Sequence, residues 1–201
     1  PTARHRISDP SLVTAYGVYM GMKACIKEAF GLRDFAGLKV AVQGAGKVGR
    51  YLIERLSKEG AKIVLAEPRE EVSARMAHEF SVDLVKPSHI YSVDCDIFSP
   101  CALGGLLNGH TIPRLKSRIV AGAANNQLLN SHAGELLHKR GILYAPDYVI
   151  NAGGLICVVM DMEKADDEYS GLYTRSKPII SDPLSAFPLP WSGHAYFLKM
   201  K

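Results

Sequence analysis

The segment LKVAVQGAGKVG, residues 38–49, joins an apolar run to a turn in which three glycines stand at the spacing GxGxxG. A helical pattern follows to about Glu59, and a second apolar run, residues 62–67, ends in the acid Glu67. A strand, a glycine turn, a helix and an acid-ended strand in this order are typical of a dinucleotide-binding βαβ unit. The glycine string alone is weak support, because glycines cluster in many turns. The acid, 18 residues beyond Gly49, and the flanking elements decide the interpretation.

Each residue of this unit has a physical task in a dinucleotide site. Gly44 would make the tight turn out of the strand, Gly46 would let the backbone approach a pyrophosphate, and Gly49 would let the helix pack closely on the sheet. The helix N-terminus would offer unpaired N–H groups and a partial positive charge to the phosphates. Glu67 would accept hydrogen bonds from the adenosine ribose hydroxyls. The competing interpretation of Glu67, a solvated charge at a strand end, is disfavoured by its position.

The residues at the end of the second strand bear on the choice between NAD and NADP. Glu67 favours NAD, because a carboxylate repels a 2′-phosphate. Arg69 lies two residues further on and could instead bind such a phosphate. It could equally be a solvated charge at the start of a helix, which is the interpretation we favour. We therefore predict NAD as the cofactor.

Composition places the chain among ordinary globular proteins and excludes several classes of function. Its 201 residues are 47% hydrophobic and 22% charged, enough apolar sequence for a sizeable core. The net charge of +4 includes no dense basic block, so nucleic-acid binding is not expected. The longest apolar stretch, Tyr148–Met160, is short for a membrane span, and we expect a cytoplasmic protein with no membrane partner. The four cysteines lack zinc-ligand spacing and are interpreted as small buried residues in a reducing compartment, with no metal site.

Strand and helix patterns alternate along the chain and predict an α/β fold, a Rossmann-type doubly wound parallel sheet with an irregular C-terminal tail. Residues 1–10 are interpreted as a linker, 11–164 as the NAD-binding domain including a helix over 11–30, and 165–201 as an atypical tail. Ser11 or Asp9 would cap the first helix and Gly31 would end it; Ser131 would cap a later one. The other helices are expected over 46–59, 70–80 and 132–140, and the strands over 38–43, 62–67, 82–85, 96–98, 118–121 and 142–144.

Several strings outside the glycine turn carry a family resemblance. They are VTAYGV (13–18), AVQG (41–44), CDIF (95–98), PCALGG (100–105), AGAANNQ (121–127) and YAPDYVINAGG (144–154). Together they resemble the cofactor-binding domain of the glutamate/leucine/phenylalanine/valine dehydrogenase family, most closely its leucine dehydrogenases. The resemblance covers about residues 9–164.

The resemblance implies oxidative deamination of a branched-chain or aromatic L-amino acid to a 2-oxo acid and ammonia, with hydride passing to NAD. Thr14 would lie near the nicotinamide carboxamide, and Gly46, Lys47 and Val48 would lie against the pyrophosphate. The other residues implied are Pro100, Cys101 and Ala102 lining the cofactor cleft, Ala123 and Asn125 at the nicotinamide ribose, Asn151 at the nicotinamide or substrate, and Leu155 and Val158 in the side-chain pocket. An apolar wall of this kind disfavours glutamate, because burying an unpaired carboxylate costs several kcal/mol.

The family's catalytic lysines and aspartate lie on a separate N-terminal domain, and no matching lysine motif occurs in these 201 residues. We therefore expect no catalytic residue here. A truncated or rearranged gene product and a domain excised from a longer protein both fit. The resemblance implies homo-oligomers for full-length members. The alternative function is a non-catalytic dinucleotide-binding module.

Each residue carried over from the family also has a plain structural interpretation. Thr14 could be an ordinary first-turn helix residue, and Asn125 and Asn126 could be turn formers. The stretch 151–154 could be a helix-breaking loop. Leu155 and Val158 could be core residues. His132 and His138 are interpreted as surface residues of a helix.

Overall fold

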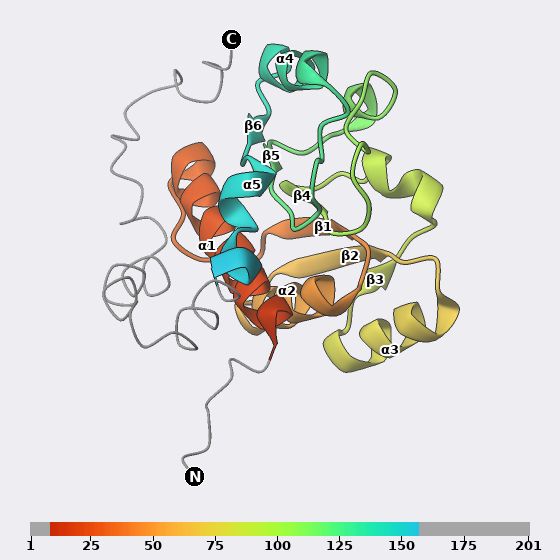
Figure 1. Ribbon diagram of the computed structural model, residues 1–201. Coiled ribbons are helices and arrows are strands. Elements are labelled where there is room, and N and C mark those ends of the chain that lie inside the picture. The colour runs from red at the N-terminus through yellow and green to blue at the C-terminus, as the bar shows by residue number, and fades with distance from the viewer. Residues whose placement is uncertain (1–8, 157–201) are drawn as a thin grey trace, which may run out of the picture.

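The computed structural model describes residues 9–156, which form one parallel β-sheet with helices packed on both faces (Figure 1). All neighbouring strands are parallel, and their order is β3-β2-β1-β4-β5-β6. The strands are β1 (Lys39–Gln43), β2 (Lys62–Ala66), β3 (Asp83–Leu84), β4 (Ile97–Pro100), β5 (Ile119–Val120) and β6 (Leu143–Tyr144). The predicted doubly wound α/β fold is confirmed. The predicted tail and the cysteine at 157 lie outside the described residues.

The helices alternate with these strands as the sequence pattern predicts. They are α1 (Pro10–Phe30), α2 (Lys47–Lys58), α3 (Glu70–Phe80), α4 (Ser131–Lys139) and α5 (Asp147–Ile150), with short 3₁₀ helices η1 (Pro87–Ser92) and η2 (Ile112–Arg114). Most boundaries lie within one or two residues of those expected. The short strands β3 and β5 each lose one residue at both ends relative to the predicted ranges.

Helix α1 begins and ends through local capping. The Asp9 carboxylate accepts a hydrogen bond from the Ser11 N–H at 2.9 Å, so Asp9 is the cap and Ser11 is not. Pro10 is already helical, one residue inside the predicted linker. At the other end Gly31 takes a left-handed conformation, with φ +71°, as predicted.

The predicted cap of α4 is wrong by one residue. The Asn130 side chain, not that of Ser131, accepts the Ala133 N–H at 3.1 Å, and Ser131 is the first helical residue. Both residue types are good N-caps, so the sequence does not separate them. His132 and His138 are exposed on this helix, as interpreted.

The core lies on both faces of the sheet because side chains alternate along each strand. On one face Val40 and Val42 pack in a cluster with residues of α1, α2 and α3. On the other face Ala41 and Phe98 pack with residues of η1, η2 and α4. The described thiols are free, with Cys25 and Cys95 buried and Cys101 half-buried.

Helix α1 is also fixed to the far end of α2 by polar contacts. Lys23 forms an ion pair with Glu59 at 3.0 Å, and the Tyr19 hydroxyl hydrogen-bonds to the same carboxylate. Arg55 of α2 stacks over the rings of Tyr16 and Tyr19. These contacts hold the middle of α1 against the C-terminal end of α2. At the start of α1, the Tyr51 hydroxyl of α2 donates to the capping acid Asp9 at 3.0 Å. Within residues 9–156 no helix is long and apolar enough to cross a bilayer.

The strands β2 and β3 are added on one side of β1, and β4 to β6 are added on its other side, so the strand order reverses between β1 and β4. These two strands are parallel neighbours, with Gln43 opposite Pro100. Strands β2 and β3 lie on one side of this point, and β5 and β6 on the other. Loops leaving the carboxyl ends of adjacent strands diverge there, and the crevice between them is where open α/β sheets bind ligands. The candidate residues that follow β1, β2, β4 and β5 all lie at the carboxyl edge of the sheet.

Candidate functional site

The glycine turn after β1 is built as close packing requires. Gly44 has φ +94° and donates its N–H to the Ala66 carbonyl at 2.9 Å. A Cβ on Gly44 would lie 2.9 Å from the Ala102 Cβ, and one on Gly49 would lie 2.4 Å from the Gly44 carbonyl oxygen. Glycine is therefore needed at both positions, for backbone conformation at the first and for contact between α2 and the turn at the second.

Gly46 differs from its two neighbours because nothing crowds it. A Cβ built on it would meet no atom within 4 Å, and its φ of −66° suits any residue. It stands at the N-cap of α2, where no side chain caps the helix. The amides of the first turn of α2, which include those of Lys47 and Val48, have no acceptor within the helix. Open space beside uncapped amides at a positive helix end fits a phosphate group.

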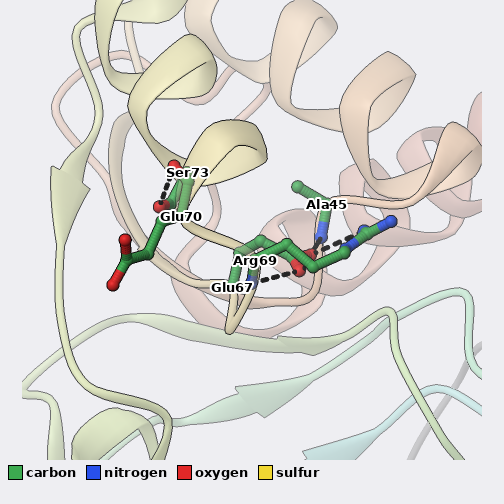
Figure 2. Close-up of polar contacts among 5 residues, drawn as sticks. All are labelled: Ala45, Glu67, Arg69, Glu70 and Ser73. Atoms are coloured by element: carbon green, nitrogen blue, oxygen red, sulfur yellow. Dashed lines mark hydrogen bonds and ion pairs between the residues drawn. The ribbon is translucent and has the colours of Figure 1, made fainter.

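Glu67 is held below this turn by four hydrogen bonds (Figure 2). Its Oε2 accepts the Ala45 N–H at 2.8 Å and the Arg69 Nη2 at 3.0 Å. Its Oε1 accepts the Arg69 backbone N–H at 3.1 Å and Nε at 2.7 Å. The side chain is only 3% exposed. Bonds from the Arg69 side chain, and then those from the two backbone amides, lower the pKa of Glu67 to about 2 against the opposing effect of burial.

The structure bears on both interpretations made at this strand end. Glu67 is a buried, bonded carboxylate, which agrees with the rejection of a solvated strand-end charge. The interpretation favoured for Arg69 is corrected. Arg69 is not simply a solvated charge at a helix start, because its guanidinium pairs with Glu67. The pairing raises the pKa of Arg69 through the same hydrogen bonds.

The segment after β4 connects the glycine turn to the loop after β5. The Cys101 N–H donates to the Gln43 carbonyl at 2.8 Å, and Ala102 contacts Gly44 as described. The Pro100 carbonyl accepts the Ala124 N–H at 2.9 Å. The three predicted cleft residues, 100–102, thus lie between the two halves of the candidate site.

Three residues predicted at the nicotinamide end meet through one side chain. The Asn151 Nδ2 donates to the Asn125 Oδ1 at 2.7 Å and to the Ala123 carbonyl at 3.3 Å. Asn151 follows α5, and the other two follow β5, so segments distant in sequence converge. The contact gives Asn125 and Asn151 a defined partner, which a plain turn former or helix-breaking loop does not need.

Two positioning residues near this cluster lie within the quoted family strings, but the sequence alone assigned them no role. Asp147, at the start of α5, accepts the backbone N–H of Asn126 at 2.5 Å and the Tyr144 hydroxyl at 3.0 Å. Asn126 has φ +51°, a conformation that costs a non-glycine residue energy unless its surroundings fix it. Buried Gln127 donates to the carbonyls of Gly122 and Ala124 at 2.8 and 2.9 Å and fixes the same loop from inside.

Thr14 and the stretch 151–154 pack against each other. The Thr14 hydroxyl donates to the Pro10 carbonyl at 3.0 Å, and a Cβ on Gly154 would lie 2.6 Å from its Oγ1. A Cβ on Gly153 would lie 2.5 Å from the Val13 carbonyl oxygen. Residues 151–152 form a turn and both glycines are already helical, so 151–154 is not wholly a helix-breaking loop. The two glycines let this segment reach the surface of α1. Thr14 has an ordinary helical hydrogen bond, so its nicotinamide role stays a prediction.

The two residues predicted for the side-chain pocket have different outcomes. Leu155 is 69% exposed and is not a core residue of the described chain. Val158 lies outside the described residues. Among residues 9–156, no three His, Cys, Asp or Glu side chains gather where they could hold a metal ion.

Comparison with protein families gives one match over most of the chain. The family model for Glutamate/Leucine/Phenylalanine/Valine dehydrogenase matches residues 8–68 and 65–173. The two matches overlap at the end of β2 and together include every predicted site residue.

Curated relatives agree with this match. A leucine dehydrogenase of Geobacillus stearothermophilus is 53% identical over 154 residues, which are 77% of this chain and 42% of that protein. An L-tryptophan dehydrogenase of Nostoc punctiforme is 46% identical over 160 residues, 79% of this chain and 45% of that protein. The chain thus spans less than half the length of these relatives.

Solved structures show the same fold. The crystal structure of the L-tryptophan dehydrogenase from Nostoc punctiforme superposes with a TM-score of 0.72 and 47% identity, over 73% of this chain and 45% of that one. A hetero-hexameric glutamate dehydrogenase from Thermus thermophilus superposes with a TM-score of 0.68 at 21% identity, over 88% of this chain and 45% of that one. The second likeness, at low identity, shows the fold alone.

Proposed function

The chain belongs to the Glutamate/Leucine/Phenylalanine/Valine dehydrogenase family, and from that premise we propose that it supplies the NAD-binding domain of an amino-acid dehydrogenase. The whole enzyme would deaminate leucine-like branched-chain or aromatic L-amino acids to 2-oxo acids and ammonia. The proposed domain extends over residues 11–164.

One observation supports the proposal most strongly. At the switch point of the sheet, the uncrowded backbone at Gly46 and the buried carboxylate of Glu67 lie on either side of Ala45. The pyrophosphate would lie against residues 46–48, and Glu67 would hold the adenosine ribose. Bound NAD supplies the hydride acceptor, the nicotinamide ring.

The residues at the other end of the crevice would orient that ring. Hydride transfer needs the reacting carbons within about 3–3.5 Å of each other, so a ring that rotates freely reacts slowly. The bonded pair Asn125–Asn151 presents polar groups at fixed positions, and Thr14 lies beside the loop that carries Asn151. These residues bind and orient. The family's proton-transferring lysines are proposed to lie outside this chain, on another part of the enzyme.

The names of the relatives and one exposed side chain support the proposed substrate class. Similar proteins are a leucine, a tryptophan and a phenylalanine dehydrogenase, the last from Lysinibacillus sphaericus at 44% identity, all with apolar substrates in their names. Leu155 is exposed and lies four residues after Asn151 in the sequence, and we propose that it contacts such a side chain. We further propose that the whole enzyme is cytoplasmic. It would assemble as a homo-oligomer through regions outside this chain.

A non-catalytic dinucleotide-binding module is the alternative, since the catalytic lysine motif does not occur in this sequence. An NADH titration followed by fluorescence, beside a leucine deamination assay on the same preparation, tests both functions. Binding without turnover by this chain supports the cofactor-domain proposal. Turnover in a protein that adds the relatives' remaining half excludes the alternative. The absence of NADH binding would refute both.

A further inference from the structure

Helix α1 carries two glycines on the face that meets the end of α5, which lies across it in Figure 1. A Cβ built on Gly17 would lie 2.7 Å from the carbonyl oxygen of Ile150, and one on Gly21 would lie 2.4 Å from the Ile150 Cγ2. Both glycines are inside an α-helix, where alanine is the more favourable residue. What they supply is therefore space, which lets α5 lie against the backbone of α1.

The peptide bond that lies on Gly17 is the one that carries Asn151. The carbonyl of Ile150 is joined directly to the Asn151 nitrogen, and the buried Ile150 side chain packs in the core cluster of α1 and α2. From this backbone the Asn151 Nδ2 reaches the Asn125 Oδ1 at 2.7 Å and the Ala123 carbonyl at 3.3 Å. A shift of the peptide by a few tenths of an ångström would change both hydrogen bonds. The position of the Asn151 amide thus depends on the space at Gly17.

Helix α1 also contacts the helix at the other end of the proposed site. Its capping acid Asp9 accepts the Tyr51 hydroxyl of α2 at 3.0 Å, and its Lys23 pairs with Glu59, the C-cap of α2, at 3.0 Å. The first turn of α2 is where the pyrophosphate is proposed to bind. Because α1 touches both α2 and the peptide of Asn151, a substituent at Gly17 would displace the nicotinamide end relative to the pyrophosphate end.

Resting on the proposed function, we propose that Gly17 and Gly21 are positioning residues for the nicotinamide ring. They seat the Ile150–Asn151 peptide on α1 and thereby hold the Asn151 amide where it orients the ring. The contact at Gly17 is with a backbone atom, which moves only with the chain. The contact at Gly21 is with a side-chain methyl group, so the effect of Gly21 should be the smaller of the two.

The test measures the affinity of Gly17→Ala for NADH and for ADP-ribose by isothermal titration. Weakening the two hydrogen bonds of the Asn151 amide corresponds to about a tenfold change in affinity, so NADH should bind about tenfold more weakly. ADP-ribose lacks the nicotinamide and should bind within about twofold of its affinity for the unchanged chain. Gly21→Ala should weaken NADH binding about threefold, again without loss of ADP-ribose affinity.

A double-mutant cycle shows whether Gly17 acts through Asn151. Asn151→Ala alone should weaken NADH binding about tenfold, because it removes the amide that Gly17 positions. Adding Gly17→Ala to Asn151→Ala should cause no further loss, since two changes that act through one group are not additive. Additive losses in the double variant would overturn the proposed role of Gly17.

The control is Gly134→Ala in α4, where a Cβ would lie 3.5 Å from the Leu128 Cδ1, an ordinary contact. It should leave both affinities unchanged and raise the Tm by about 2–4 °C through helix propensity. If Gly17→Ala shows no cooperative thermal transition, the NADH-to-ADP-ribose affinity ratio of Gly21→Ala decides. An unchanged ratio in the folded variant would overturn the positioning role and leave the proposed function intact. Failure of the unchanged chain to bind either ligand would refute the proposed function itself.

Discussion

The two halves of the candidate site are built differently. The proposed adenosine half, residues 44–49 and 67, comes from one strand–turn–helix–strand unit and offers mainly backbone groups. The proposed nicotinamide half, residues 123, 125 and 151, joins the loop after β5 to the segment after α5 through a side-chain amide. Substitutions in the first half should therefore act through backbone space, and those in the second through side-chain contacts.

The largest expected effect comes from filling the contact between α2 and the turn. In Gly49→Val, Cβ would lie 2.4 Å from the Gly44 carbonyl oxygen, a backbone atom that cannot move alone. We expect a loss of about 3 kcal/mol or more in the free energy of unfolding, measured by urea denaturation. Gly46→Ala is the matched control, because it adds an atom to the same turn in open space. Equal stability of the two variants would show that the turn is not closely packed.

Gly46→Val separates binding from stability in the same half. The valine side chain would occupy the space proposed for the pyrophosphate, so NADH affinity should fall at least about tenfold. The stability cost should be about 1 kcal/mol, the loss of a favourable N-cap residue. Because ADP-ribose shares the pyrophosphate, its affinity should fall equally. Isothermal titration with both ligands checks this, and undiminished affinity would mean that the pyrophosphate lies elsewhere.

Asp147→Asn probes the nicotinamide half in isolation. It weakens the bond that holds the left-handed Asn126, and with it the loop that carries Asn125. The substitution replaces a charged acceptor of one hydrogen bond with a neutral one. It should weaken NADH binding about fivefold and leave ADP-ribose binding unchanged. Asp34→Asn, at an exposed position in the loop before β1, is the control. A parallel loss of ADP-ribose affinity would indicate general loosening of the fold and not a role in positioning.

The smallest effect is a change in acid stability. Because the folded-state pKa of Glu67 is lowered from 4.5 to about 2, its stabilisation is complete above pH 4.5 and is lost as pH falls toward 2. Arg69 is exposed, so the contribution at neutral pH is about 1 kcal/mol. Glu67→Gln should lose that amount at pH 7 and approach the unchanged chain near pH 2, as followed by thermal unfolding. The control is Glu71→Gln, which makes the same change at an exposed position on α3.

The same contrast explains how much the sequence predicted. The unit from β1 to β2 was placed within a residue or two, because apolar runs, glycines and the terminal acid are local signals. The nicotinamide half was predicted only through family resemblance, since no spacing along the chain brings residue 125 to residue 151. That convergence depends on the order of β4, β5 and β6 in the sheet.

Side-chain partners were the least predictable feature. Asp147 was given no role from the sequence, and its bond to Asn126 requires the fold. Arg69 was interpreted as a solvated charge because its pairing depends on the turn that brings it back to Glu67. Asn130 and Ser131 are neighbours of similar capping ability, so the error there was one residue.

The most direct test of the two-part site is a crystal structure of the chain with NADH bound. The account predicts the pyrophosphate against the amides of residues 46–48, the adenosine ribose on Glu67 and the nicotinamide beside Asn125 and Asn151. Density for the cofactor away from the switch point between β1 and β4, or with its two ends exchanged, would contradict it.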